Sequence, residues 1–499
     1  MVPLVTHALY KVFNMSFPIL SSILLCPIVG LLLILLTPRK QENLIRWIGL
    51  CAAFVSLVLS ITLCFIFKSS DPSFQFVEHI EWIKSYGIHY SNGVDGLNVS
   101  MILLTSIVIF CGIMVSWTVT YRVKDFFANM LFLVSGVFGV FMTTNLFFFF
   151  LFYEIAVIPM YLLIVIWGST NKQYAAMKLT LYLLLGSALM FAGFLYIYSL
   201  PGGGTFDLIA LKQNVHFTPE IQNILFLGLF LGFGVLAACF PFHVWSPDGH
   251  VAAPTAASML HAGVLMKLGA YGILRVAVYL LPEGAKHWAA MIAVLALCNI
   301  VYGAMVATQQ KDLKYIIGYS SVSHMGIVLL GIATMTTVGF NGAIFQMFSH
   351  GLMTALFFAC VGFIYDGCHT RMLDELGGLS KQAPRISAFF IIAGLCGLGL
   401  PGMGSFVAEL LVTIAAVSTY PVIGITSIVA LLITAYYVLT AVQKTFYGPL
   451  NHTTAHLKDI NFFQWIPRAV LVGCLIFFGI FPQIFIQWIS VSTQALLGT

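Results

Sequence analysis

The sequence predicts an all-α polytopic membrane protein with about fourteen membrane-spanning helices. Hydrophobic residues make up 60% of the 499 residues and charged residues only 8%, which excludes a soluble globular protein. The apolar runs are continuous over roughly 20 residues, the length that a helix needs to cross a bilayer. Barrel strands instead alternate between apolar and polar residues over roughly ten residues, so a membrane barrel is excluded as well.

Fourteen apolar runs follow one another along the chain, and each is expected to form one helix. They start near residues 17, 44, 97, 126, 145, 174, 221, 255, 288, 312, 338, 386, 423 and 467. The first run, residues 17–36, is too long for a cleaved signal peptide and ends in a Pro-Arg-Lys sequence instead of a small-residue cleavage site. It is therefore expected to be the first membrane helix, whether the protein starts at Met1 or at Met15.

The basic residues predict how the chain is oriented in the cell inner (cytoplasmic) membrane. Fifteen lie on one side of the predicted helices: Arg39, Lys40, Arg46, Arg122, Lys124, Lys172, Lys178, Lys311, Lys314, Arg371, Lys381, Arg385, Lys444, Lys458 and Arg468. Six lie on the other side: Lys11, Lys68, Lys84, Lys212, Arg275 and Lys286. Because cytoplasmic loops carry the excess of Lys and Arg, both termini are expected on the non-cytoplasmic side. The longest connection, residues 68–95, lies on that outer side, and its polar and aromatic residues favour a short hairpin.

Two segments interrupt the apolar pattern: FPFHVWSPDGHVAAP after the seventh helix and LGLPGMGSFVAE in the twelfth. Proline and glycine at membrane depth free backbone groups, which is tolerated only where protein or water satisfies them. Broken helices that are five helices apart predict two inverted five-helix repeats, helices 4 to 8 and 9 to 13. The predicted divisions are residues 1–125 for the first three helices, 126–285 and 286–450 for the repeats, and 451–499 for the last helix.

Three charged residues lie inside apolar segments: Glu154 in the fifth helix, Lys267 in the eighth and Glu409 in the twelfth. A charge at this depth costs on the order of 2 to 3 kcal/mol or more, so its default interpretation is functional. An acid, a base and an acid predict proton movement along one hydrated track at mid-membrane depth. The alternatives are a hydrogen-bonded core carboxyl for Glu154, an anchoring lysine for Lys267 and a helix-capping carboxylate for Glu409.

Four histidines at membrane depth or in the breaks are candidate proton relays: His243, His261, His324 and His350. A neutral imidazole can accept one hydrogen bond and donate another, as a relay requires, although core histidines with satisfied hydrogen bonds are also common. His261 and Lys267 are six residues apart, about 600° of α-helical rotation, and are expected to serve successive steps. Lys314 at the start of the tenth helix is either a cytoplasmic anchor or part of a path for incoming protons.

The sequence predicts no cofactor, metal or redox centre in this chain. The ten cysteines are scattered, and no CxxC or Cys/His cluster could hold zinc or an iron–sulfur centre. Residues 397–402 match GxGxxG, but no strand precedes them, so we reject dinucleotide binding. Nothing in the sequence points to a nucleic-acid partner; the expected surroundings are lipid and other membrane subunits.

Five segments, in order and spacing, resemble the antiporter-like membrane subunits of respiratory complex I, and most closely the M-type (chain 4) subunit. They are FYEIAVIPMYLLIVIWG, FHVWSPDGHVAAPTAASMLHAGVLMKLGAYGILR, DLKYIIGYSSVSHMGIV, SHGLMTALFF and LPGMGSFVAE. The chain ends soon after the fourteenth helix, as in the M-type, whereas the L-type continues into a long lateral helix. The resemblance implies a translocase subunit of an NADH-quinone oxidoreductase, which moves protons while other subunits reduce quinone. It also implies L-type and N-type neighbours.

The resemblance also assigns residues. Glu154 corresponds to the family's fifth-helix glutamate, Lys267 to its eighth-helix lysine and Glu409 to its twelfth-helix acid. Three histidines match polar positions that recur in the family: His243, His324 and His350. The fourth, His261, resembles the eighth-helix histidine of L-type relatives.

One departure from the family lies in the broken seventh helix. The family usually has a lysine there and a proline soon after, but this chain has Leu236 and Ala238. Glu154 therefore lacks its expected ion-pair partner. Lys178 and Lys267 are the candidate replacements, or the first half-channel is altered or silent. The alternatives to a complex I subunit are a subunit of a multisubunit sodium/proton antiporter or membrane-bound hydrogenase, and a structural spacer that no longer pumps.

Overall fold

The computed structural model describes residues 17–498, so Met1, Lys11 and Met15 lie outside the described residues. Within that range, thirteen helical segments are long and apolar enough to span a membrane. They are α2 (Ile19–Leu36), α3 (Glu42–Ile66), α4 (Gly96–Val115), α5 (Val123–Met142), α6 (Leu146–Trp167), α7 (Lys172–Ser199), α9 (Pro219–Leu236), the composite helix Thr255–Val278, α13 (Pro282–Gln309), α14 (Leu313–Ala333), α15 (Thr337–Cys368), α19 (Pro421–Phe446) and α20 (Phe462–Ile480).

Both predicted helix breaks are present. The twelfth of the expected helices consists of α17 (Pro384–Gly397) and α18 (Gly404–Thr419), which completes the fourteen predicted spans. Between its two parts, Gly399 and Gly402 have φ values of 68° and 94°, a region that glycine adopts without strain. The seventh helix, α9, ends at Leu236 and is followed by η3 (Phe242–Val244) and α10 (Trp245–Ala252). The inverted relation of the two halves and the four divisions stay predictions.

The eighth helix is not a regular α-helix. It runs through α11 (Thr255–Leu260), the π-helical turn η4 (His261–Leu265), α12 (Met266–Gly272) and a second π-helical turn, η5 (Ile273–Val278). The 600° rotation expected between His261 and Lys267 assumes a uniform α-helix, and η4 makes that assumption wrong. Bulges of this kind often occur at functional sites.

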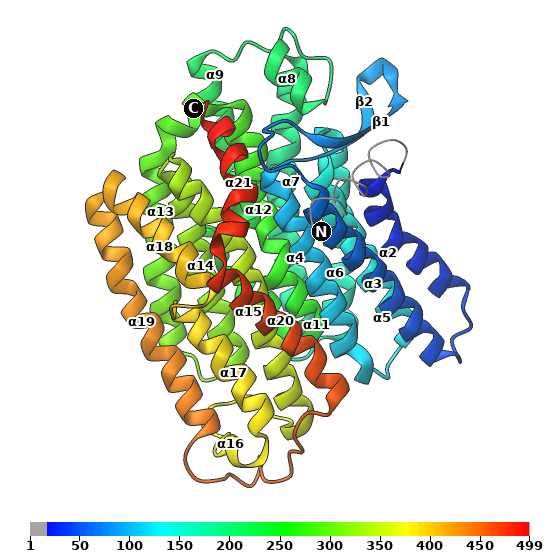
Figure 1. Ribbon diagram of the computed structural model, residues 1–499, viewed down its shortest axis with the longest axis vertical. Helices are drawn as coiled ribbons and strands as arrows, with labels where there is room; N and C mark the ends of the chain where they lie inside the picture. The colour runs from blue at the N-terminus through cyan, green and yellow to red at the C-terminus, as the bar shows by residue number, and fades with distance from the viewer. Residues whose placement is uncertain (1–16, 499) are drawn as a thin grey trace, which may run out of the picture.

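The two ends of the bundle have different secondary structure, as Figure 1 shows, and they also differ in charge. One end, here the hairpin end, has α8 (Leu208–Asn214) and the predicted hairpin, formed by β1 (Gln75–Ile83), η1 (Lys84–Tyr86) and β2 (Ile88–Val94). The opposite end, here the basic end, has α16 (Leu379–Gln382) and the connections that contain Arg122, Lys172, Lys311 and Arg371. A short turn, η2 (Ser116–Thr118), follows α4 at the basic end.

Besides the short helices α8 and α16, the apolar pattern did not predict α21 (Pro482–Leu497). It follows α20 and is too short to cross a bilayer alone. Its Ser492 hydroxyl accepts a hydrogen bond of 2.8 Å from the amide of Gly96 at the start of α4, and Phe485 stacks on Phe345 of α15. In Figure 1, α20 and α21 (red) run obliquely across the front of the bundle. The helix therefore covers the buried centre of the bundle.

Burial divides the helices into a core and a periphery. In the composite helix, α14 and α15, nearly every residue is buried, whereas in α2, α3, α7 and α19 most residues are partly or fully exposed. The exposed residues are apolar; Leu36 and Leu432, for example, are 82% and 71% exposed. A soluble monomer rarely exposes such continuous apolar surfaces, and here they face lipid or neighbouring subunits. The chain is thus a multi-pass membrane protein.

A buried ion pair holds the hairpin end together. Asp95 caps α4 by accepting a hydrogen bond from the amide of Leu97, and Arg275 of η5 donates to the same carboxylate. The guanidinium also donates to the hydroxyl of Tyr271, which donates at 3.0 Å to the carbonyl of Phe141 in α5. Because every partner is satisfied, this pair is a structural joint between three helices.

Candidate functional site

Lys267 lies in the centre of the bundle on α12, and its side chain is completely buried. Its Nζ donates a hydrogen bond to the carbonyl of Ala262 and lies 2.8 Å from Nδ1 of His350 on α15. An anchoring lysine extends its ammonium group to the membrane surface, whereas this one contacts a second titratable group in the core. Lys267 and His350 are close enough to exchange a proton directly.

The contacts continue from His350 to Glu409. The rings of His350 and His324 (α14) are 5.3 Å apart, and Nδ1 of His324 lies 3.4 Å from Oε1 of Glu409 on α18. Gln346 bridges the last two groups, with its Nε2 at 3.2 Å from His324 and 3.4 Å from Glu409. We call these four titratable residues the central track: Lys267, His350, His324 and Glu409. The track crosses from the eighth helix to the broken twelfth.

The helix break gives Glu409 its place. Glu409 is 5% exposed and does not cap α18, which has no side-chain cap; its contacts are with Gln346 and His324. A Cβ atom at position 399 would lie 2.6 Å from Oε2 of Glu409, so Gly399 leaves the room that the carboxylate occupies. The break therefore brings an acid to the end of the central track.

A second pair of histidines lies beside Lys267. His250 of α10 and His261 of η4 have ring centroids 4.2 Å apart, and Nε2 of His250 lies 3.1 Å from the hydroxyl of Ser246. His261 also contacts Trp245, with centroids 5.3 Å apart. Lys267 and His261 thus face different neighbours, as successive steps require. Sequence reasoning missed His250, although it is the second histidine of the broken segment, seven residues after His243.

Each of the five buried histidines has at least one ring nitrogen without a hydrogen-bond partner within residues 17–498. They are Nδ1 of His250, Nε2 of His324, Nε2 of His350 and both nitrogens of His243 and His261. Buried polar atoms of a static core are hydrogen-bonded in roughly 90% of cases or more. Free ring nitrogens of this kind are the positions at which a histidine accepts or releases a proton.

His243 and Lys178 lie outside the central track. His243 packs between Phe240 and Tyr302, with ring centroids 5.6 Å and 4.9 Å away. Nζ of Lys178 lies 2.7 Å from Oδ2 of Asp248. Lys178 is therefore committed to an acid in the broken seventh helix and is not the partner of Glu154.

Glu154 is also separate from the track. It is half-buried on α6, on an outward-facing stripe with Leu151 and with Ile158, which is 55% exposed. Its Oε1 has no hydrogen-bond partner within residues 17–498, and the hydroxyl of Ser187 on α7 faces its carboxyl group. Lys178 lies nine residues before Ser187, about 13 Å along the helix axis. Among the hydrogen bonds and ion pairs within residues 17–498, none joins Glu154 directly to the central track, and the expectation of one track through residues 154, 267 and 409 stays a prediction.

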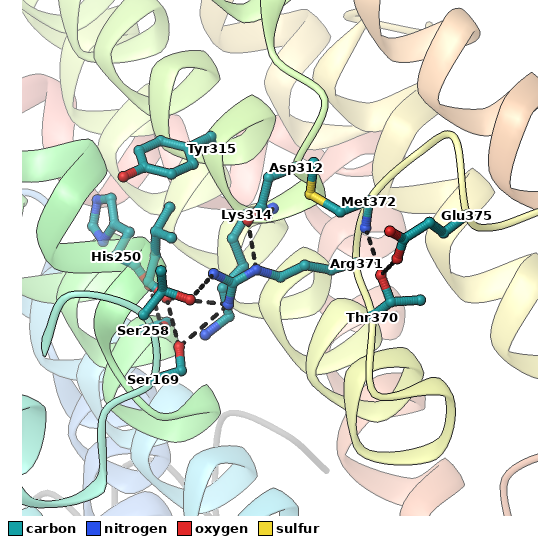
Figure 2. A network of polar contacts seen from close by, with 12 residues as sticks. Ser169, His250, Ser258, Asp312, Lys314, Tyr315, Thr370, Arg371, Met372 and Glu375 are labelled. Carbon is teal, nitrogen blue, oxygen red and sulfur yellow. Dashed lines mark hydrogen bonds and ion pairs between the residues drawn. The ribbon is translucent and has the colours of Figure 1, made fainter. Parts of the chain in front are cut away.

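Lys314 lies at the basic end but is buried, whereas a lysine that anchors a helix at the membrane surface is exposed. Its side chain is 4% exposed, and Nζ donates a hydrogen bond of 2.7 Å to the carbonyl of Ala253, where α10 ends. Arg371 lies beside it and donates to Asp312 at 2.6 Å and to the carbonyl of Val251 at 3.3 Å (Figure 2). By contrast, Lys311 is exposed and pairs with Asp374, as an anchor does.

Comparisons with known proteins agree on one family. The family model described as "NADH:quinone oxidoreductase/Mrp antiporter, TM" matches residues 143–434. NAD(P)H-quinone oxidoreductase chain 4 of Gloeobacter violaceus is 36% identical, over 96% of this chain and 93% of its own length. NADH-quinone oxidoreductase subunit M of Rickettsia conorii is 34% identical, over 97% of this chain and 99% of its own length.

A solved structure supports the same grouping. A chain of respiratory complex I from Thermus thermophilus superposes with a TM-score of 0.88, at 28% identity, over 96% of this chain and 100% of that one. The matched family model covers more than half of this sequence, and the relatives match over nearly their whole length. The chain therefore belongs to the M-type (chain 4) family of antiporter-like membrane subunits of NADH-quinone oxidoreductases.

Proposed function

We propose that this chain is the proton-translocating membrane subunit of a complex I type NADH-quinone oxidoreductase. Its own chemistry is proton transfer, through Lys267, His350, His324 and Glu409. Quinone reduction occurs on other subunits and drives the transfer from a distance, so that this chain holds no cofactor or metal. Its neighbours are L-type and N-type antiporter-like subunits and lipid. The basic end faces the cytoplasm, and the hairpin end faces the other side of the membrane.

The single observation that carries this proposal is the continuity of the central track. The ammonium of Lys267 gives its proton to Nδ1 of His350, where an N–H bond forms as the lysine N–H bond breaks. His350 then releases a proton from Nε2 toward His324, and His324 passes one to the carboxylate of Glu409. Each step joins groups that are already neighbours, so small helix movements are enough to make or interrupt the path.

A variant of the last group tests the proposal. Glu409→Gln removes the acid but keeps the size of the side chain, and the complete complex is assayed in inside-out membrane vesicles. We expect quinone reduction to continue in part while the number of protons taken up per electron falls. The matched control is Glu283→Gln, which removes an exposed acid at the hairpin end that pairs with Lys286. Normal pumping per electron in Glu409→Gln contradicts the role of Glu409.

A structural spacer is the second candidate function, and the surroundings of Glu154 favour it. Leu236 is 1% exposed and occupies the place of the usual base, which leaves the first half without an ion pair at Glu154. A spacer tolerates Lys267→Ala without loss of pumping and gains nothing from Leu236→Lys. Unchanged proton stoichiometry in both variants supports the spacer, and a loss in Lys267→Ala rejects it.

A further inference from the structure

A cavity of about 740 Å³ opens at the basic end of the bundle. It lies between η2, the start of α11, the end of α15 and the connection before α20. The residues that matter for its chemistry are Ser116, Thr255, Lys314, Asp366, His369 and Lys458. An open cavity of this size, lined in part by polar and charged side chains, has ample space for water. It therefore brings the aqueous phase to the buried break between α10 and α11.

Two ionisable groups line the same cavity but differ in exposure. Asp366, on the last turn of α15, is exposed, whereas Lys314 is 4% exposed. Nζ of Lys314 donates its hydrogen bond to the carbonyl of Ala253. An exposed acid beside a buried base is an arrangement that takes protons from water into the protein.

The groups behind Lys314 lead to the central track. The carbonyl of Ala253 also accepts a hydrogen bond of 3.1 Å from the hydroxyl of Ser258, which lies 2.8 Å from the carbonyl of His250. The imidazole of His250 lies 4.2 Å, centroid to centroid, from that of His261 in η4, which continues directly into α12 with Lys267. Figure 2 shows Lys314, Ser258 and His250 at one side of the Arg371 network. His250 and His261 are thus the titratable groups between the cavity and Lys267.

The wall between the cavity and His250 is held in place by three consecutive hydrogen-bonded carbonyls. Arg371 donates to the carbonyl of Val251, the amide of Ser169 donates to Ala252 at 2.8 Å, and Lys314 donates to Ala253. Arg371 cannot carry a proton, because its guanidinium does not deprotonate in proteins. It is a positioning residue, and Lys314 is the one titratable group among these donors.

We propose that this cavity is the proton entrance of the chain. The carboxylate of Asp366 takes a proton from water and passes it to neutral Lys314, so that an O–H bond breaks and an N–H bond forms at Nζ. Lys314 then gives the proton to Nδ1 of His250, His250 gives one to its neighbour His261, and His261 gives one to Lys267, an N–H bond breaking on the donor as one forms on the acceptor. This inference rests on the proposed function.

Arginine at position 314 tests the entrance. Lys314→Arg keeps the charge and the donor to the Ala253 carbonyl but cannot deprotonate. We expect proton uptake coupled to quinone reduction to fall about tenfold or more in vesicles that contain the fully assembled complex. The matched control is Lys311→Arg, three residues away and exposed, which should pump normally. If Lys314→Arg pumps like the wild type, Lys314 only holds the carbonyl of Ala253 in place, and the proposal is overturned.

Asp366 gives an independent test, because a substitution at this exposed position leaves assembly intact. We expect Asp366→Asn to lower proton uptake to a similar extent, and Asp366→Glu to restore it. If Lys314→Arg prevents assembly, Asp366→Asn decides alone, and normal uptake in that variant overturns the entrance. Glu409→Gln, assayed beside it, separates the two proposals. Loss in Glu409→Gln with normal Asp366→Asn rejects only the entrance, and normal uptake in both also rejects the proposed function.

Discussion

Glu154 and Glu409 are both acids in apolar helices, but their surroundings differ. Glu409 is buried at the end of a line of three titratable residues and contacts His324 and Gln346. Glu154 lies half-buried on an outward-facing stripe, with no ion pair to a base among residues 17–498. A charged residue at membrane depth thus indicates a candidate functional position, but the side chains in contact with it determine its role. We infer that the second half of the chain transports protons and that Glu154 does not take part.

The largest expected effect concerns the stability of the first half. Arg275→Met leaves Asp95 buried without its partner, and we expect a loss of about 3 to 5 kcal/mol in folding free energy. Thermal unfolding of the purified complex measures it. Replacing both partners, Arg275→Met with Asp95→Asn, should destabilise less than the single change. If the double variant loses as much folding free energy as the single variant, Arg275 and Asp95 do not stabilise the protein as a pair. The interpretation of the charges at the hairpin end as structural is then wrong.

The largest effect on transport is expected at Lys267. Lys267→Met keeps the side-chain volume but removes the proton carrier next to His350. We expect the rate of the proton-transfer step to fall about 100-fold or more. Proton uptake during single turnovers of the assembled complex measures this rate. Lys286→Met, in which the lost lysine is exposed and pairs with Glu283, is the control and should behave like the wild type.

The comparison is sharpened most by Glu154→Gln. Because Glu154 has no contact with the central track, we expect proton uptake per electron to change by less than about twofold, smaller than the loss of any relay group. The same vesicle assay applies, with Glu409→Gln beside it. A loss as large as that of Glu409→Gln means that a neighbouring subunit supplies the missing base, and then the first half transports protons too.

The smallest effect is expected at Asp374 in the exposed connection after α15. A hydrogen bond from Lys311 and the charges of Lys311 and Lys444 lower the pKa of Asp374. A lowered pKa stabilises the folded state at pH values above the ordinary pKa of an aspartate. This stabilisation is lost as the pH falls through the lowered pKa of Asp374. Since the pair is exposed, Asp374→Asn should leave unfolding at pH 7 almost unchanged. A marked drop in unfolding temperature at pH 7 contradicts this ranking.

Much of the fold follows from local sequence, because long apolar runs and proline–glycine breaks act within one segment. The fourteen spans, both breaks and the hairpin after α3 are all of this kind. The π-helical turn at His261 and the short helix α21 depend on packing against distant segments, which the apolar pattern does not contain.

The site shows the same limit. The types and depths of Lys267 and Glu409 are visible in the sequence, but their connection through His350 and His324 joins four helices. The pairing of Lys178 with Asp248 likewise depends on how α7 meets the broken seventh helix. Sequence alone therefore identified most of the titratable groups but could not tell which of them are neighbours.

The most direct test of the central claim is a structure of the assembled membrane arm at a resolution that shows ordered water. We predict water molecules at the free nitrogens of His250, His261, His350 and His324, in a line that reaches Glu409. We also predict dry packing between Glu154 and Lys267. Dry side-chain packing between Lys267 and Glu409, or a continuous line of water from Glu154 to Lys267, contradicts the account.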